Sequence, residues 1–506
     1  MMFTSPYNRL PLLLAISVLL TGCFGEKDNA APKPDDSRIN IAMLQPPRSG
    51  LTPLSDDAFK LSRWSTAETL VVLDATGDAK PALATSWSQT DAKTWRFTLR
   101  PDVHFHDNSL LTASTVVNSL SVAANSAPKP RILDGVSLRV KADGEHAVTV
   151  TTATPDPLLP QRLSSPQLAI LAAGAYQNGV VNPVNAGSGP FVLREIYGTS
   201  GARLDRFEGY WGEKAKASGI DVSFVPDGGA RAAALRTGHA DIVEAIPVSQ
   251  APLLDQKLVH EVPMPRTNTL YLNTRTGVFA QPAMRAAARE AVNRKELVEN
   301  VYENRADIAE GLLGPALPWA AVLRRPVANP VAPADPAGAT ITLATFSDRT
   351  ELPEVAVYLA QQLTAAGFQV KQVVREYAQI ESDALAGKFD AFILSRATVL
   401  DSGDPVAYLY SDFSCKGSFN ISQLCQPDIG RALEKAAAIP AGEQRRQAIM
   451  DAEQLILASD AAIPLLHERV IQGESAAIRN ALRDPRERLL VNAATLLDKG
   501  REKDDE

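Results

Sequence analysis

Apolar and polar positions along the chain alternate in a way that predicts strands and helices in turn. Short runs rich in apolar and β-branched residues indicate strands, and apolar residues three to four positions apart indicate helices. In the first half of the chain we expect strands at 39–44, 95–100, 147–151 and 221–225, and helices at 113–124 and 229–237. Such alternation is typical of an α/β protein.

The clearest local pattern lies between residues 341 and 394. A strand is expected at 341–346, a helix at 355–366, and further strands at 369–374 and 389–394. A βαβ unit followed by a second crossover predicts three parallel strands. Ligands of open parallel sheets bind outside the carboxyl ends of the strands. Arg349 follows the first of these strands and Asp401 follows the last, so we expect both loops to face the same edge.

A proline-rich stretch precedes this unit. Residues 314–336 contain six prolines, which predicts irregular backbone over the whole stretch. The charged residues 498–506 are expected to form a terminal tail without regular structure.

The N-terminus has the order of a secretory signal. Arg9 is followed by the apolar run 10–20 and then by the residues Leu20-Thr21-Gly22-Cys23, which resemble the bacterial lipobox. We expect residues 1–22 to be a signal peptide, Cys23 to carry lipid, and residues 23–37 to be a tether. The chain is then exported, periplasmic or at the cell surface, and anchored to a membrane by lipid. An ordinary signal with a chance cysteine is the alternative.

The net charge and the cysteine content limit the classes of function that the chain can have. The chain has 506 residues and a formal net charge of −7, which gives no broad attraction for nucleic acid. No second apolar run approaches the length of a transmembrane helix. The two remaining cysteines, Cys415 and Cys425, are expected to form a disulfide in an exported protein, with two free buried thiols as the alternative.

Seven segments in a fixed order carry a resemblance to a known family. They are residues 67–71, 81–87, 94–100, 103–107 with 111–113, 187–191, 238–242 and 270–274, and Asn108 stands where glycine is usual in the family. Together they resemble the extracytoplasmic substrate-binding proteins of ABC importers, in the large peptide/nickel family.

The resemblance implies an α/β, two-lobed, type II periplasmic-binding-protein-like fold of the large cluster, with an extra subdomain in the first lobe. Lobe I is expected to take residues 38–262, with 471–496 returning to it, and lobe II residues 263–470. The two hinge crossings are expected near 262–268 and 466–473.

The resemblance also implies a ligand site. Asp401 matches the aspartate that holds the ammonium of a bound peptide, and Arg349 matches the arginine that grips its carboxylate. Cys415 and Cys425 match a disulfide just downstream. Three further candidates are Arg396 as an added positive charge, Tyr408 at the mouth of the site and His467 near the lobe junction.

The expected function is that of a monomeric solute-binding lipoprotein which delivers a short peptide to an ABC permease and its ATPase. Because a second cation at Arg396 favours an anionic ligand, a nickel–histidine or opine-type metal chelate is the alternative. Neither a cofactor nor a metal centre in the chain itself is expected, since His104 and His106 fall in a structural strand and turn. An enzyme is disfavoured because no nucleophile elbow, zinc motif or nucleotide fingerprint occurs. A sensor that does not transport remains open.

Overall fold

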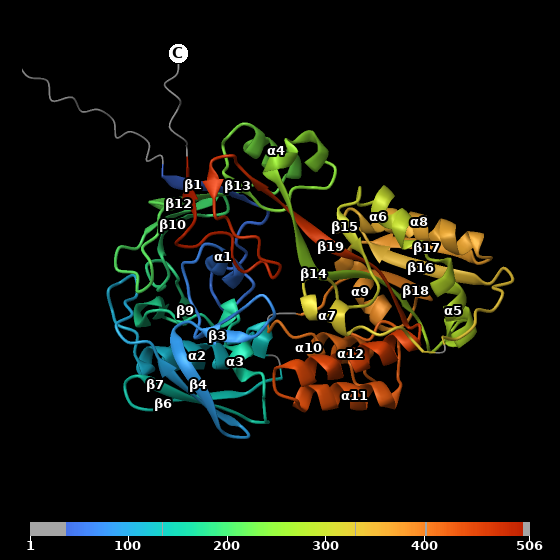
Figure 1. The fold of residues 1–506 in the computed structure, drawn as a ribbon, viewed down its shortest axis with the longest axis horizontal. Helices are drawn as coiled ribbons and strands as arrows, with labels where there is room; N and C mark the ends of the chain where they lie inside the picture. The colour runs from blue at the N-terminus through green and yellow to red at the C-terminus, as the bar shows by residue number, and fades with distance from the viewer. Residues whose placement is uncertain (1–36, 134, 329, 400–401, 499–506) are drawn as a thin grey trace, which may run out of the picture. The chain divides into compact units, whose positions relative to one another are not determined.

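The computed structural model describes residues 37–133, 135–328, 330–399 and 402–498 (Figure 1). The expected signal peptide, Cys23, residues 24–36 of the expected tether, and Asp401 all lie outside these ranges.

Short strands alternate with helices along the described chain. The strands are β1 (Arg38–Met43), β2 (Val71–Leu73), β3 (Ala79–Pro81), β4 (Ala84–Asp91), β5 (Thr94–Leu99), β6 (Leu138–Ala142), β7 (Ala147–Thr152), β8 (Tyr176–Gln177), β9 (Val180–Val181), β10 (Phe191–Tyr197), β11 (Gly201–Arg206), β12 (Gly219–Phe224), β13 (Ile242–Val243), β14 (Val259–Leu272), β15 (Ala306–Ile308), β16 (Thr340–Phe346), β17 (Gln369–Arg375), β18 (Ala391–Ala397), β19 (Ala462–Glu474), β20 (Ile478–Arg479) and β21 (Leu496–Leu497). The α-helices are α1 (Ala58–Arg63), α2 (Ala113–Asn125), α3 (Leu159–Arg162), α4 (Gly228–Arg236), α5 (Pro282–Ala291), α6 (Arg294–Asn300), α7 (Pro318–Leu323), α8 (Leu352–Ala365), α9 (Tyr377–Leu385), α10 (Val406–Phe413), α11 (Pro427–Ala438) and α12 (Glu443–Ala458).

One large mixed sheet joins strands from the beginning, middle and end of the chain. Its order is β10-β11-β12-β1-β13-β19-β14-β18-β16-β17, and β15 pairs with β19 at one side. The long strands β14 and β19 pair with each other in antiparallel fashion at its centre. A separate sheet in the order β4-β5-β7-β6 packs against α2. The strands and helices expected in the first half of the chain are all present, with ends shifted by a few residues.

The three strands expected to be parallel are parallel. β16 pairs with β17 from Thr340↔Gln369 onward, and it pairs with β18 on its other side. The helix between β16 and β17, α8, buries Val355, Leu359 and Leu363 along one face, as the spacing of these residues requires.

Buried apolar residues form several distinct cores. The largest gathers side chains from Leu270 to Leu466, and the cores around β1 and β13 gather side chains from the beginning of the chain and from its last part. The second half of β14 and the first half of β19 belong to the largest core, whereas Val259 and Ile471 pack in the core around β13. Both strands therefore pass from one core to another (Figure 1).

The proline-rich stretch is not irregular throughout, which corrects the sequence expectation. It contains the short helix α7, with Pro318 in its first turn. A proline is tolerated there because the missing N–H would have no partner within the helix. Among the described helices, none combines the length and the apolar character needed to cross a membrane.

Candidate functional site

The carboxyl ends of β16 and β18 lie side by side because these strands pair in parallel, with Ala344 opposite Phe392. The chain leaves β16 for β17 on one side and then returns to β18 on the other. Right-handed crossovers then place α8 and α9 on opposite faces of the sheet, and a crevice forms at such a reversal. Arg349 follows β16 at this edge. We call the carboxyl ends of β16 and β18, with the facing parts of β14 and β19, the carboxyl edge.

Among the described residues, one acidic side chain ties Arg349 to the carboxyl edge. Its Nη1 lies 3.2 Å from Oε2 of Glu468 in β19, and its own side chain is 37% exposed. The other oxygen of Glu468 accepts a hydrogen bond from the Ser395 hydroxyl of β18. Asp348 does not compensate Arg349; its carboxylate caps α9 by accepting from the Tyr377 amide. Most donors of the Arg349 guanidinium thus have no partner among the described residues.

The guanidinium of Arg396 forms a bidentate ion pair inside the protein. Its Nε and Nη2 donate to the two oxygens of Asp412 at 2.9 and 2.8 Å, and Asp412 is wholly buried. The guanidinium also lies over the Phe419 ring, 4.3 Å from its centroid. Burial alone would lower the pKa of Arg396, but the Asp412 carboxylate outweighs this and raises it. Arg396 therefore does not supply the added positive charge that the sequence suggested, because Asp412 neutralises it.

Tyr408 is a core residue and does not stand at the mouth of a site. It is fully buried in α10, and its ring meets Phe413 edge-on at 6.1 Å. The apolar periodicity of α10, rather than a turn after Pro405, determines where Tyr408 points.

His467 is also part of the interior. It is 3% exposed in β19, its Nδ1 shares a hydrogen bond of 2.8 Å with the Thr267 hydroxyl, and the backbone of Gly314 packs against its ring. Burial lowers the pKa of His467 to about 4, so the ring is neutral at pH 7. Successive residues of a strand point to opposite faces, which is why Glu468 reaches the carboxyl edge and His467 does not.

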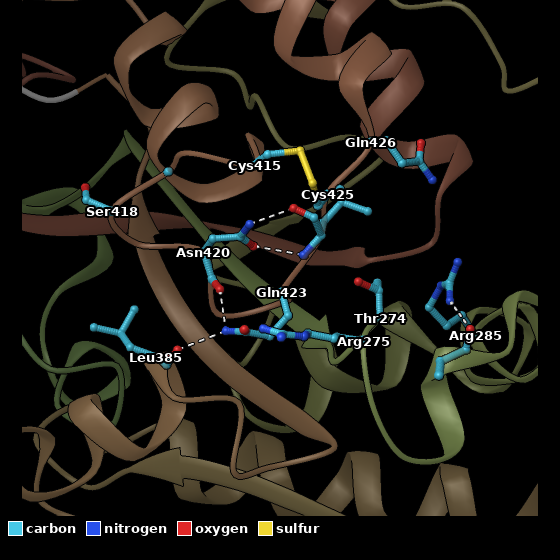
Figure 2. Close-up of a pocket in the computed structure, with 13 residues that line it drawn as sticks. Thr274, Arg275, Arg285, Leu385, Cys415, Ser418, Asn420, Gln423, Cys425 and Gln426 are labelled. Carbon is cyan, nitrogen blue, oxygen red and sulfur yellow. Dashed lines mark hydrogen bonds between the residues drawn. A yellow bond between two sulfur atoms is a disulfide. The ribbon is translucent and has the colours of Figure 1, made fainter.

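The expected disulfide between Cys415 and Cys425 is present. It closes a loop that holds Phe419 against Arg396, with the Phe419 amide donating to Ser411 O of α10. Figure 2 shows the pocket of about 710 Å³ beside this bridge, lined by Asn420 and Gln423 among others. The amides of both residues are bonded to backbone carbonyls of the pocket wall. Because the pocket also includes Thr274 and Arg275, it lies beyond the opposite end of β14 from the carboxyl edge.

Two residues of the carboxyl edge were not foreseen from the sequence. Arg266 of β14 lies opposite Ala397 of β18, and its Nη1 donates to Ser395 O at 3.2 Å. Glu468 interrupts the apolar run of β19. A charged residue inside a buried strand needs a partner, and this signal could have drawn attention to Glu468.

Three of the segments that carry the family resemblance, 67–71, 103–107 with 111–113, and 187–191, contribute residues to a network of buried or partly buried polar contacts. Ser188, Tyr210 and Trp211 all donate to the carboxylate of Glu68. His106 bonds through Nε2 to Gly189 O at 2.9 Å, and its burial lowers its pKa to about 4. Within the described ranges, no group of three or more His, Cys, Asp or Glu residues could hold a metal ion.

Comparison with known proteins gives a consistent result. A family model described as bacterial extracellular solute-binding proteins, family 5 Middle, matches residues 78–420. A curated relative, the probable di/tripeptide-binding protein 5 of Pseudomonas aeruginosa, is 27% identical over 79% of this chain and 84% of its own length. The nickel-binding periplasmic protein of Escherichia coli is 29% identical over 50% of this chain and 51% of its own length.

A solved structure has the same fold. The nickel ABC transporter protein from Bacillus halodurans superposes with a TM-score of 0.77 over 91% of this chain and all of its own, at 23% identity. The fold is thus the two-lobed, type II periplasmic-binding-protein fold. With the family model covering most of the sequence, the chain belongs to the extracellular solute-binding proteins of family 5.

Proposed function

We propose that this protein captures a short peptide with a free C-terminus and delivers it to the permease of an ABC importer. The protein acts as a monomer, and a partner ATPase supplies the energy. Export exposes it outside the cytoplasm, and lipid on Cys23 holds it at a membrane surface. Replacement of Cys23 with serine, followed by detergent phase partitioning, tests the anchor: the variant is expected in the aqueous phase and the parent protein in the detergent phase.

The geometry of Arg349 is the observation that carries this proposal. Its guanidinium is partly exposed at the carboxyl edge, where a sheet of this topology binds ligands, and Glu468 occupies only part of its donor set. A peptide carboxylate matches the planar fork of the remaining donors. Asp401 follows β18 in the sequence and is proposed to accept the peptide ammonium. The similarity to a relative named as di/tripeptide-binding supports the same ligand class.

The proposed lobes are residues 38–262 with 471–496, and residues 263–470. The passage of β14 and β19 between cores supports placing the hinge crossings at 262–268 and 466–473. A ligand enclosed between the lobes would stabilise the closed arrangement.

A metal chelate is the second candidate, because Arg349 and Arg266 at the carboxyl edge also suit a ligand rich in carboxylates. The similarity to a nickel-binding relative supports this alternative. In that case the chelator would hold the metal, and the arginines would bind the chelator.

The test is native mass spectrometry of residues 24–506 purified from cells, followed by denaturation to identify what co-purified. A short peptide supports the main proposal, and a nickel, cobalt or zinc complex favours the alternative. The identified peptide is then titrated as free acid and as C-terminal amide into the parent protein, Arg349→Gln and Asp401→Ala. Arg349→Gln is expected to lose at least about tenfold in affinity for the free acid and little for the amide. Equal losses for both ligands would contradict the carboxylate contact.

A further inference from the structure

We infer that Arg266 is a second carboxylate contact of the binding site and makes it selective for ligands with an acidic group at the carboxyl edge. This inference rests on the proposed function to the extent that a ligand carrying a carboxylate enters there. It adds a residue from a different strand, β14, to the recognition attributed to Arg349.

The pairing of charges around Arg266 is the first support. Two carboxylates, Glu468 and Glu487, act electrostatically on Arg266, and each is engaged by another arginine. Glu468 contacts Arg349, and Glu487 lies 3.9 Å from Arg63. Among the residues that the structure describes, none places a carboxylate oxygen within 4.0 Å of the Arg266 guanidinium. Arg266 therefore carries a positive charge that no described carboxylate contacts directly.

The backbone of β14 is also irregular at Arg266. Pro263 pairs with Arg469 and Thr267 pairs with His467, so three residues of β14 stand opposite the single residue Glu468 of β19. Such a bulge re-aims side chains and occurs preferentially beside functional sites. Arg266 is the last residue of this bulge, which explains how a strand at the centre of the sheet presents a charged group at the carboxyl edge.

The guanidinium of Arg266 also has hydrogen-bond donors without a described partner. Arg266 donates one described hydrogen bond, from Nη1 to Ser395 O at 3.2 Å. A guanidinium has five N–H donors, so this contact fixes the group while most donors remain available. Arg349 is close enough to oppose the positive charge of Arg266 and to lower its pKa, after the larger effect of burial. An anion placed between the two arginines would relieve the repulsion and accept hydrogen bonds from their remaining donors.

A purely structural role is the competing explanation, because the bond to Ser395 O also fastens β14 to β18. The two roles differ in what a substitution changes. If the role is structural, a substitution of Arg266 lowers the stability of the empty protein and weakens the affinity for every ligand equally. A carboxylate contact affects affinity according to the charge of the ligand and leaves the affinity for an amidated ligand nearly unchanged.

The experiment measures binding by native mass spectrometry and calorimetry with three probes. These are a defined mixture of di- and tripeptides with free C-termini, the same peptides as C-terminal amides, and the nickel–histidine complex. The variants are Arg266→Gln and Arg266→Lys. The control is Arg275→Gln, which removes the same charge just beyond the other end of β14, where Arg275 is exposed beside the disulfide pocket.

We expect Arg266→Gln to weaken binding of the free acids, or of the nickel–histidine complex, by about tenfold or more. Arg266→Lys should recover part of this loss, since it keeps the charge but not the planar fork. Arg275→Gln should behave like the parent protein, and the melting temperature of empty Arg266→Gln should stay close to that of the parent.

Each contrary result identifies what has failed. If the parent protein binds free-acid probes and Arg266→Gln binds them equally well, the inference about Arg266 is wrong and the proposed function stands. If Arg266→Gln loses affinity equally for acids and amides, the residue is structural. If the parent protein binds none of the acidic probes, both the inference and the proposed function are overturned.

Discussion

Arg446 of α12 donates to the carboxylate of Asp78 in the turn between β2 and β3, with Nη2 and Oδ1 2.8 Å apart. The same turn packs against the loop before α10, because a Cβ added at Gly77 would lie 3.4 Å from Gly403 O. These contacts join a segment of the proposed lobe I to a segment of the proposed lobe II. The ion pair therefore helps to hold the arrangement seen in the structure.

Arg446→Gln is expected to weaken ligand binding about two- to fivefold, because a partly exposed ion pair contributes up to about 1 kcal/mol. The effect should shrink in high salt, which screens such pairs. Calorimetry at low and high ionic strength measures it. Arg431→Gln is the matched control, since Arg431 pairs with Asp428 on the exposed side of α11. A loss that does not depend on salt would show that Arg446 acts through packing instead.

Asp412→Asn is expected to destabilise the protein by about 3 kcal/mol, because it leaves the Arg396 guanidinium partly buried beside a neutral partner. Urea unfolding of the two proteins measures the difference. Adding Arg396→Met to the variant should restore part of the stability by removing the unpaired charge. Asp428→Asn, in an exposed pair, should change the free energy of unfolding by less than about 0.5 kcal/mol. A similarly small loss for Asp412→Asn would contradict the importance of the buried pair.

His467 is expected to make stability depend on pH. Its pKa is about 4 in the folded protein and near its ordinary value of 6.5 when unfolded. The unfolded chain therefore binds more protons between these values, and the stabilising contribution is complete above about pH 6.5 and is lost as the pH falls toward 4. The full loss corresponds to about 3 kcal/mol.

Urea unfolding from pH 7 to pH 4 tests this prediction with His467→Asn, whose amide can still bond to the Thr267 hydroxyl. The variant should lose less stability on acidification than the parent protein. Some dependence should remain, since the pKa of His106 is lowered to a similar value. His239→Asn is the control because His239 is exposed. Parallel pH profiles for parent and His467→Asn would contradict the assignment.

Removing the disulfide with Cys415→Ser and Cys425→Ser together is expected to cost about 2–3 kcal/mol, through the restriction of a short loop in the unfolded chain. The measurement is urea unfolding with and without a reducing agent. Reduction should lower the stability of the parent protein to that of the double variant and leave the variant unchanged. A variant as stable as the oxidised parent would show that the loop holds Phe419 against Arg396 without the bridge.

Periodicity predicted the elements that position the site. Apolar runs and helical spacing located β16, α8, β17 and β18, and the handedness of crossovers then placed Arg349 at the carboxyl edge. The two downstream cysteines also pair as their number in an exported chain suggested. These features depend on local sequence and on general topology, so a single sequence sufficed.

The partners of charged residues were not predictable in the same way. Asp412 neutralises Arg396 from a helix sixteen positions later, and only the packing of α10 on the sheet brings them together. The orientation of His467 depends on the register of β19, which a bulge shifts by more than one residue. Arg266 has no motif around it, and the pairing of Glu468 and Glu487 with other arginines depends on the folded chain.

Under the proposed function, the bulge between β14 and β19 would couple ligand binding to the proposed hinge. Arg266, proposed to contact the ligand, and Glu468, which holds the other proposed contact Arg349, lie in the same few peptide units where the two strands pass between cores. Ligand contacts with these residues would therefore act directly on the proposed hinge strands, without intermediate residues. A permease that contacts both proposed lobes could then distinguish the ligand-bound protein from the empty one by the angle between them, without contacting the ligand.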